Sequence, residues 1–91
     1  MTFKESVIDS FLKTFHDSKE KIRAFEGCLH LELLQDKYHT NVYSTYSHWE
    51  SEEALNKYRD SELFKDVWSN TKILFDAKPT ANSYQQIVKL D

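Results

Sequence analysis

The most constraining feature of the chain is a pair of strand-like segments in which neither face is polar enough to be fully exposed to solvent. The side chains of residues 28–34 alternate between a leucine face and a mixed face, namely Leu29, Leu31 and Leu33 against Cys28, His30 and Glu32. Residues 41–49 are rich in β-branched and aromatic side chains and predict the return strand. If Gln35 pairs with Asn41, the register places His30 opposite Tyr46 and Cys28 opposite His48. Both faces of this hairpin must be at least partly covered by other elements.

Helical periodicity accounts for most of the remaining chain. Apolar residues recur at three- and four-residue steps from Ile8 to Phe25, with charged side chains on the opposite side, which predicts an amphipathic helix. Gly27 follows at a position where a helix end commonly needs a left-handed residue. Ser51 and Ser61 predict the caps of two further helices.

The last part of the chain predicts a break followed by a strand. Pro79 cannot continue a helix, and it biases the residue before it towards an extended backbone. In residues 82–90, Tyr84, Val88 and Leu90 would share one face of a final strand.

This order of helix, hairpin, helices and strand is typical of an α+β domain with a ferredoxin-like, split βαβ layer and an antiparallel sheet. The 91 residues form a single domain over residues 1–91. The layout needs a strand before the first helix, where only residues 1–3 are available, so we expect a first strand that is unusually short or missing. An upstream native start, a trimmed chain or a substitute strand would each explain this. The C-terminal strand of this chain or of a partner is the obvious substitute, because buried neighbouring strands need hydrogen-bond partners.

Charge and cysteine content exclude several classes of protein. The net charge is −3, and the basic residues are scattered among acidic ones, so no basic stripe predicts a nucleic-acid partner. The single cysteine, Cys28, cannot form an internal disulfide, which fits a reducing compartment. No apolar run is long enough to span a bilayer, and no signal peptide is apparent at the start. We therefore expect a cytoplasmic protein without a membrane partner.

Three segments resemble the antibiotic biosynthesis monooxygenase (ABM) family. They are residues 25–28 (FEGC), residues 46–55 (YSHWESEEAL) and residues 58–64 (YRDSELF), and the similarity runs from about Phe3 to Tyr84. The resemblance implies a ferredoxin-like fold in which two copies pack their sheets into a dimeric α/β barrel. Each copy would keep a pocket between its sheet and its helices. Family members include oxygenases that oxidise phenols without metal or flavin, haem-degrading enzymes and quinol oxygenases.

The resemblance does not extend to the diagnostic residues of the known branches. The haem-degrading branch carries a Trp and a His where this chain has Tyr58 and Trp68, so haem binding or degradation is disfavoured. A cofactor-free oxygenase of the family carries an Asn four residues before the conserved Trp, where this chain has Thr45. Polyphenol oxidation is therefore not implied by residue identity.

The candidate site residues are aromatic and imidazole side chains. Trp49, Tyr58, Trp68 and Tyr46 are the predicted substrate-binding residues, although each could equally serve core packing. His30 and His48 are the candidate catalytic bases, because an imidazole near its ordinary pKa can accept a phenolic proton. The alternative for both is a hydrogen-bonded structural imidazole. We predict no metal site, because the spacing of His30, Glu32 and His48 matches no recognised motif.

The function predicted from the resemblance is cofactor-independent oxidation of a phenol or quinol by O₂, carried out by a homodimer without a bound cofactor. The alternative is a non-catalytic dimer of the same fold that binds a small aromatic molecule. A domain of this size buries only about 60–65% of its unfolded surface, which by itself favours association.

Overall fold

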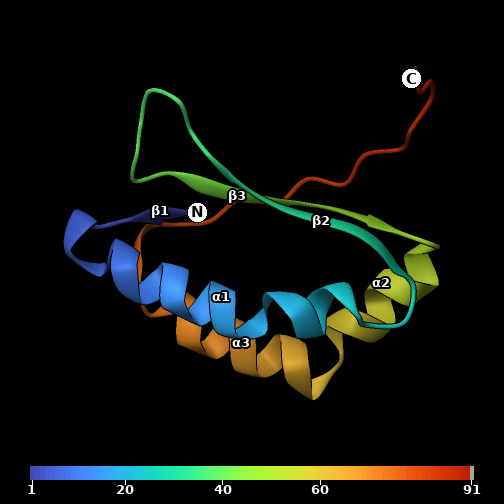
Figure 1. The fold of residues 1–91 in the computed structure, drawn as a ribbon, viewed down its shortest axis with the longest axis horizontal. Helices are drawn as coiled ribbons and strands as arrows, with labels where there is room; N and C mark the ends of the chain where they lie inside the picture. Colours follow the sequence, from blue (N-terminus) through green and yellow to red (C-terminus); the bar gives the residue numbers. More distant parts are fainter. Residues whose placement is uncertain (91) are drawn as a thin grey trace.

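The computed structural model describes residues 1–90 as an α+β domain (Figure 1). Its elements in chain order are β1 (Thr2–Phe3), a 3₁₀ turn (Glu5–Val7), α1 (Ile8–Arg23), β2 (Cys28–Gln35), β3 (Tyr43–Trp49), α2 (Glu52–Arg59), α3 (Glu62–Lys72) and β4 (Phe75–Ala77). The predicted α+β class with antiparallel strands is confirmed. Figure 1 shows α1 and α3 side by side beneath the strands, with α2 near one end of the long hairpin.

The strands form two antiparallel pairs that meet at one point. β1 pairs with β4, β2 pairs with β3, and an isolated bridge joins Thr2 to Val42. The Phe3 amide donates to the Asn41 carbonyl over 3.0 Å, and the Tyr43 amide donates to the Met1 carbonyl over 2.8 Å. The resulting spatial order, β4-β1-β3-β2, is that of a ferredoxin-like layer. The short first strand predicted from the sequence is confirmed.

The predicted strand over residues 82–90 is wrong. The last strand is β4 at Phe75–Ala77, and residues 78–90 have no regular secondary structure. The apolar side chain at Phe75 decides the position, because it packs on Phe3 with ring centroids 5.5 Å apart. Pro79 then removes a backbone donor close to the strand end.

The predicted register of the hairpin is also wrong. Gln35 pairs with Tyr43 instead of Asn41, so the connecting loop is longer than expected. Asp36 organises that loop, because its Oδ1 accepts hydrogen bonds from the amides of Tyr38 and His39 over 2.9 and 2.8 Å. Asn41 is unavailable to β2, since its carbonyl and side chain both bond the backbone of β1.

The corrected register changes which side chains face each other. His30 lies opposite His48, and Glu32 lies opposite Tyr46. A register irregularity between Cys28 and His30 also breaks the predicted alternation. Cys28 is buried opposite Trp49, whereas Leu29 is 57% exposed, so Cys28 does not share a face with His30 and Glu32.

The core is centred on an aromatic cluster under β1. Phe3, Phe11 and Tyr43 are buried together, with Phe3 stacked on Phe11 at a ring separation of 4.2 Å. Aromatic rings remove much apolar area from water per residue, which suits a small domain.

Both predicted serine caps are confirmed. The Ser51 Oγ accepts from the Ala54 amide over 3.0 Å, and the Ser61 Oγ accepts from the Phe64 amide over 3.1 Å. The caps fix where α2 and α3 begin, and thereby the positions of Tyr58 and Trp68 relative to the sheet.

Gly27 is the position where substitution tests this architecture most directly. Its φ is +88°, and a Cβ there would overlap the Cβ of Ala54. We expect Gly27→Ala to lower the free energy of unfolding by about 2 to 4 kcal/mol, measured by urea denaturation, because backbone strain and overpacking add. In an Ala54→Gly background the same change should cost less, since the overlap is removed. Equal losses in both backgrounds would contradict this packing.

Candidate functional site

A cavity of about 160 Å³ lies between the strands and the helix layer. α1, β2, β3, α2 and α3 all contribute to its wall. The lining residues are mostly apolar or aromatic, with three hydroxyl-bearing side chains from Thr and Ser: Met1, Phe11, Phe15, Ile22, Leu31, Thr45, Ser47, Trp49, Tyr58, Phe64, Val67, Trp68 and Thr71. A concave, mainly apolar site with a few polar groups is the usual form of a small-molecule pocket.

A continuous row of aromatic rings forms one wall of this cavity. Trp49 stacks on Tyr58 with ring centroids 4.9 Å apart, and Tyr58 meets Phe64 edge to face at 5.2 Å. Phe64 lies nearly parallel to Trp68 at 6.2 Å. Three of the predicted substrate-binding residues, Trp49, Tyr58 and Trp68, are therefore brought to one cavity from three separate elements.

Hydroxyl groups supply the polarity of the cavity. The Trp49 indole N–H donates to the Ser47 Oγ over 3.0 Å, so this hydroxyl accepts one bond and keeps its own proton for another acceptor. The Thr71 hydroxyl is already used, because it donates to the Val67 carbonyl over 2.7 Å. Thr45 lies two residues before Ser47 on the same face of β3.

Tyr58 is held in its neutral form. Burial, with a smaller contribution from the nearby Cys28 thiol, raises the pKa of the Tyr58 phenol from its usual 10.0 to about 12. At neutral pH this phenol is therefore a hydrogen-bond donor and not a base. No other lining side chain is acidic or basic.

The remaining predicted site residues lie on the opposite face of the hairpin. Tyr46, His30 and His48 form a separate cluster, in which the Tyr46 and His48 rings are 4.8 Å apart and the two imidazoles are 5.4 Å apart. The His30 Nε2 lies 3.1 Å from a Glu32 carboxylate oxygen. We call these four residues the outer cluster. None of them lines the cavity.

No candidate metal centre emerges from the outer cluster. Within residues 1–90, no group of three or more His, Cys, Asp or Glu side chains is arranged to hold a metal ion. The same residues contain no helix that is both long and apolar enough to cross a bilayer.

Thr45 and Ser47 line the cavity but were not among the predicted site residues. A period-two pattern could have found them, because both alternate with Tyr46 and His48 and share the face of Trp49. Phe64 and Thr71 carried no comparable signal, since an apolar or small position on a helix looks the same whether it lines a cavity or fills a core.

The model of the antibiotic biosynthesis monooxygenase family matches residues 1–68, which include β1, the hairpin, α2 and most of α3. The chain belongs to the ABM family. The match covers the Trp49, Tyr58 and Trp68 positions of the cavity wall.

Solved structures support the ABM fold at low sequence identity. An antibiotic biosynthesis monooxygenase is 20% identical, with a TM-score of 0.80 and 92% of each chain covered. A protein from Bordetella bronchiseptica, provisionally named as such a monooxygenase, is 15% identical with a TM-score of 0.83, covering 97% of this chain and 91% of its own.

A conserved protein from Methanosarcina mazei Go1 is 18% identical with a TM-score of 0.80, covering 85% of this chain and 76% of its own. At these identities the likeness shows the fold alone. The comparison with curated proteins gives no match. The chemistry of this ABM domain must therefore be argued from its own cavity.

The ionisation of Tyr58 makes the stability of the ABM domain fall at alkaline pH. Because the pKa is about 12 in the folded chain and about 10 in the unfolded chain, the unfolded chain loses its proton first. The contribution of the neutral Tyr58 phenol to the free energy of unfolding is fully present below about pH 10 and is lost as the pH rises towards 12. We expect the urea midpoint to fall more steeply over this range in the unaltered protein than in Tyr58→Phe. The exposed Tyr84→Phe is the matched control and should keep the full slope. Identical slopes in all three proteins would contradict the burial argument.

Proposed function

We propose that this ABM domain is an oxygenase that oxidises a single-ring phenol or quinol with O₂, without a bound cofactor. The observation that carries the proposal is the cavity beside Trp49, Tyr58 and Trp68, which offers flat apolar walls and a few hydroxyl donors. Family membership supports the reaction class, and the cavity supports the class of substrate.

The size of the cavity favours one ring. An apolar protein cavity of about 150 Å³ accommodates benzene, and the volume here is about 160 Å³. Haem and flavin ring systems are several times larger than benzene, as are the polycyclic phenols. The stacked pair of Trp49 and Tyr58 would offer its ring faces and edges to such a small aromatic ring.

The polar groups of the cavity favour a bound phenolate. The neutral Tyr58 phenol and the Ser47 hydroxyl can each donate a hydrogen bond, and such donors would stabilise a negative oxygen. No lining side chain is a base at neutral pH. The substrate would therefore lose its proton to water on entry, with the anion stabilised by these donors.

The proposed reaction balances without another reactant. A quinol and O₂ give a hydroxyquinone and water: one oxygen atom forms a bond to a ring carbon, and the other leaves as water with two hydrogen atoms from the substrate. The quinol supplies all four electrons that O₂ accepts. The protein contributes binding, orientation of the ring and stabilisation of the electron-rich anion.

Oxygen uptake with single-ring quinols tests this function. Hydroquinone and methylhydroquinone should consume O₂ faster with the protein than without it, and ¹⁸O₂ should place one labelled atom in the product. Tyr58→Phe should lower kcat about tenfold or more, because one hydrogen-bond donor to the anion is lost. Tyr38→Phe, at an exposed loop position, is the matched control.

Variants of the outer cluster test the predicted base. If His30 or His48 takes the phenolic proton, His30→Ala or His48→Ala should abolish turnover near neutral pH. Unchanged turnover in both would leave deprotonation to water, as their position on the far side of the hairpin favours. No uptake above autoxidation with any quinol would sink the oxygenase proposal in favour of the alternative, a non-catalytic ligand-binding protein. The absence of a base among the cavity side chains is the observation that supports that alternative.

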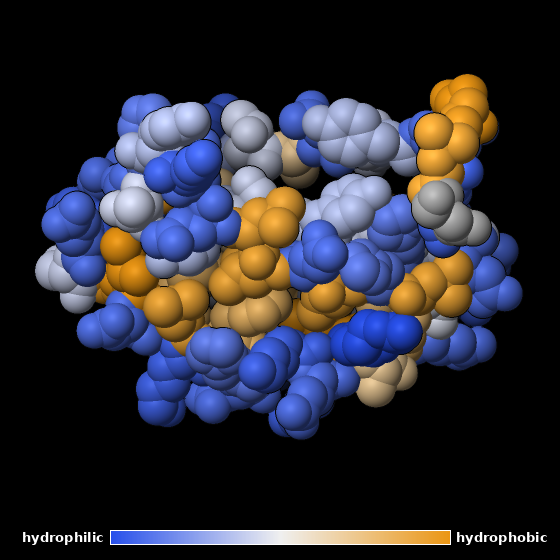
Figure 2. All heavy atoms as spheres, turned by 45° about the horizontal axis from the view of Figure 1, so that its top comes forward, coloured by the Kyte–Doolittle hydropathy of each residue, from blue (hydrophilic) through white to orange (hydrophobic). Residues whose placement is uncertain are grey.

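We also propose that the domain is a homodimer through the outer face of its hairpin. Apolar and aromatic side chains remain exposed on that face, including Leu34 at 47% and Tyr46 at 43%. Residues 78–90 carry further exposed apolar side chains, namely Tyr84, Ile87, Val88 and Leu90. Figure 2 shows hydrophobic atoms at the projecting end of this tail. A second copy over this face would cover both groups.

Sedimentation at micromolar concentration measures the proposed dimer. Leu34→Glu should weaken association about tenfold or more, because it would bury an unpaired charge in the interface. Ile73→Glu is the matched control, since Ile73 is exposed at the end of α3 in the helix layer. A monomer in the unaltered protein, or equal weakening by both variants, would contradict the proposed interface.

A further inference from the structure

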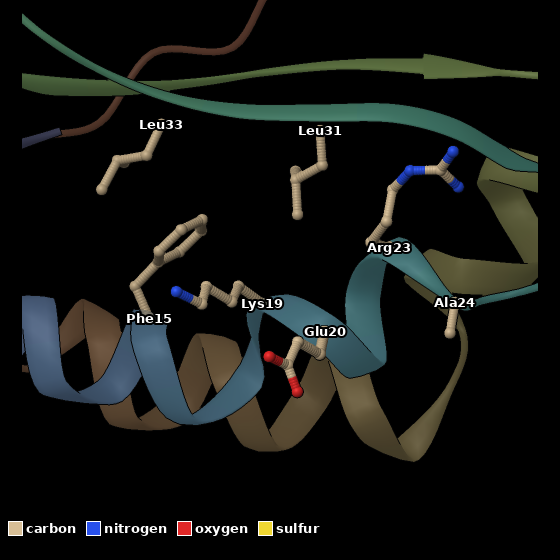
Figure 3. A pocket seen from close by; sticks show the side chains of 7 residues that line it. All are labelled: Phe15, Lys19, Glu20, Arg23, Ala24, Leu31 and Leu33. Carbon is tan, nitrogen blue, oxygen red and sulfur yellow. The ribbon is translucent and has the colours of Figure 1, made fainter.

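A second hollow of about 400 Å³ lies outside the cavity, along the groove between α1 and β2. Figure 3 shows Leu31 and Leu33 pointing from β2 towards α1, with Phe15 rising from α1 to meet them. Lys19 and Arg23 stand on the helix beside this apolar floor, and Glu20 and Ala24 complete the lining. The hollow therefore combines an apolar floor with a charged border, and Figure 2 shows a band of hydrophobic side chains flanked by hydrophilic ones on one face of the molecule.

The groove and the cavity are adjacent. Phe15 and Leu31 line both of them, so these two side chains form the partition between the inner and the outer space. Both are only partly buried, and both are side chains without polar anchors. A ligand whose ring lies in the cavity could therefore place a substituent in the groove by passing these two side chains.

The charge of the groove border is predominantly positive where it faces the floor. Arg23 is held by a hydrogen bond from its Nη1 to the Cys28 carbonyl over 2.7 Å. The Lys19 Nζ lies 3.1 Å from the His16 Nδ1, and Figure 3 shows it near Phe15. Within residues 1–90 neither cation takes part in an ion pair. The Glu20 carboxylate points away from the two leucines in Figure 3.

Volume and charge lead to one class of ligand. The cavity holds about one ring, so a substituent that leaves the ring on the side of Phe15 and Leu31 would lie in the groove. In the groove the substituent would first contact the apolar side chains of Leu31 and Leu33 and then the Lys19 ammonium. This arrangement fits a short aliphatic chain that ends in an anionic group. A neutral or cationic end would leave the Lys19 ammonium without an anionic partner.

We propose that the groove is the second half of the substrate site and that it selects an aromatic ring with a short anionic side chain, with Lys19 as the specificity-determining residue. This inference rests on the proposed function only for the placement of the ring in the cavity. It names the substrate class as an aryl-alkanoate phenol or quinol. Lys19 acts on binding and has no part in the oxidation.

The test is a binding titration with two matched probes, 3-phenylpropanoate and 3-phenylpropanamide, which differ mainly in charge. Both tryptophans of the chain line the cavity, so intrinsic fluorescence excited at the red edge reports on its occupancy. We expect the unaltered protein to bind the propanoate about threefold more tightly than the amide. Lys19→Gln should remove this preference by weakening the propanoate alone, and Lys19→Arg should keep it.

The matched control is Lys13→Gln, which removes an exposed lysine of the same helix that pairs with Asp17 outside the groove. Equal binding of both probes to the unaltered protein, equal weakening of both by Lys19→Gln, or binding of neither probe would overturn the proposal. Because the titration needs no turnover, the two proposals fail separately. A Lys19-dependent preference for the propanoate without oxygen uptake would support the groove proposal and contradict the oxygenase proposal. Oxygen uptake with neutral quinols, without a preference for the charged probe, would support the oxygenase proposal and contradict the groove proposal.

Discussion

The structure depends on the packing of Phe3 between the sheet and α1. Its ring is fully buried and stacks on Phe11, while its backbone bonds to Asn41 and thereby joins the β1–β4 pair to the β2–β3 hairpin. A two-residue strand supplies few hydrogen bonds of its own, so burial of this aromatic ring must provide most of its attachment. The position of β1 in the middle of the sheet therefore depends more on the burial of the Phe3 side chain than on the few hydrogen bonds of the strand.

The hairpin divides the molecule into two chemical environments. Its inner face brings Leu31, Ser47 and Trp49 to the cavity, and its outer face carries the imidazoles with Tyr46. The irregularity at Cys28 turns that thiol inwards, beside Tyr58, where burial favours neutral groups. The result is an aromatic site without a charged side chain on one face and a titratable cluster on the other.

This division shapes what the site can do. A cavity that offers stacking and neutral donors can bind and stabilise an electron-rich aromatic anion, but it leaves the reactivity to the substrate and O₂. The groove adds what the cavity lacks, because Lys19 places a positive charge beyond the partition of Phe15 and Leu31. In the proposed substrate site, recognition of the ring and recognition of the charge would therefore be carried by adjacent spaces.

The sequence by itself determined the helices, the β2–β3 hairpin, the two serine caps, the left-handed Gly27 and the family. These follow from local periodicity, local hydrogen bonds and the residues around Trp49. It also indicated Trp49, Tyr58 and Trp68, which lie at one cavity. Only the tertiary structure decided the register, since the capture of Asn41 by β1 lengthens the loop and brings His30 opposite His48. It alone decided that β4 forms at Phe75–Ala77, because the long-range contact with Phe3 outweighs the local strand preference of residues 82–90. Which face of the hairpin meets the helices is likewise a long-range property, because an alternating pattern with two mixed faces does not specify it.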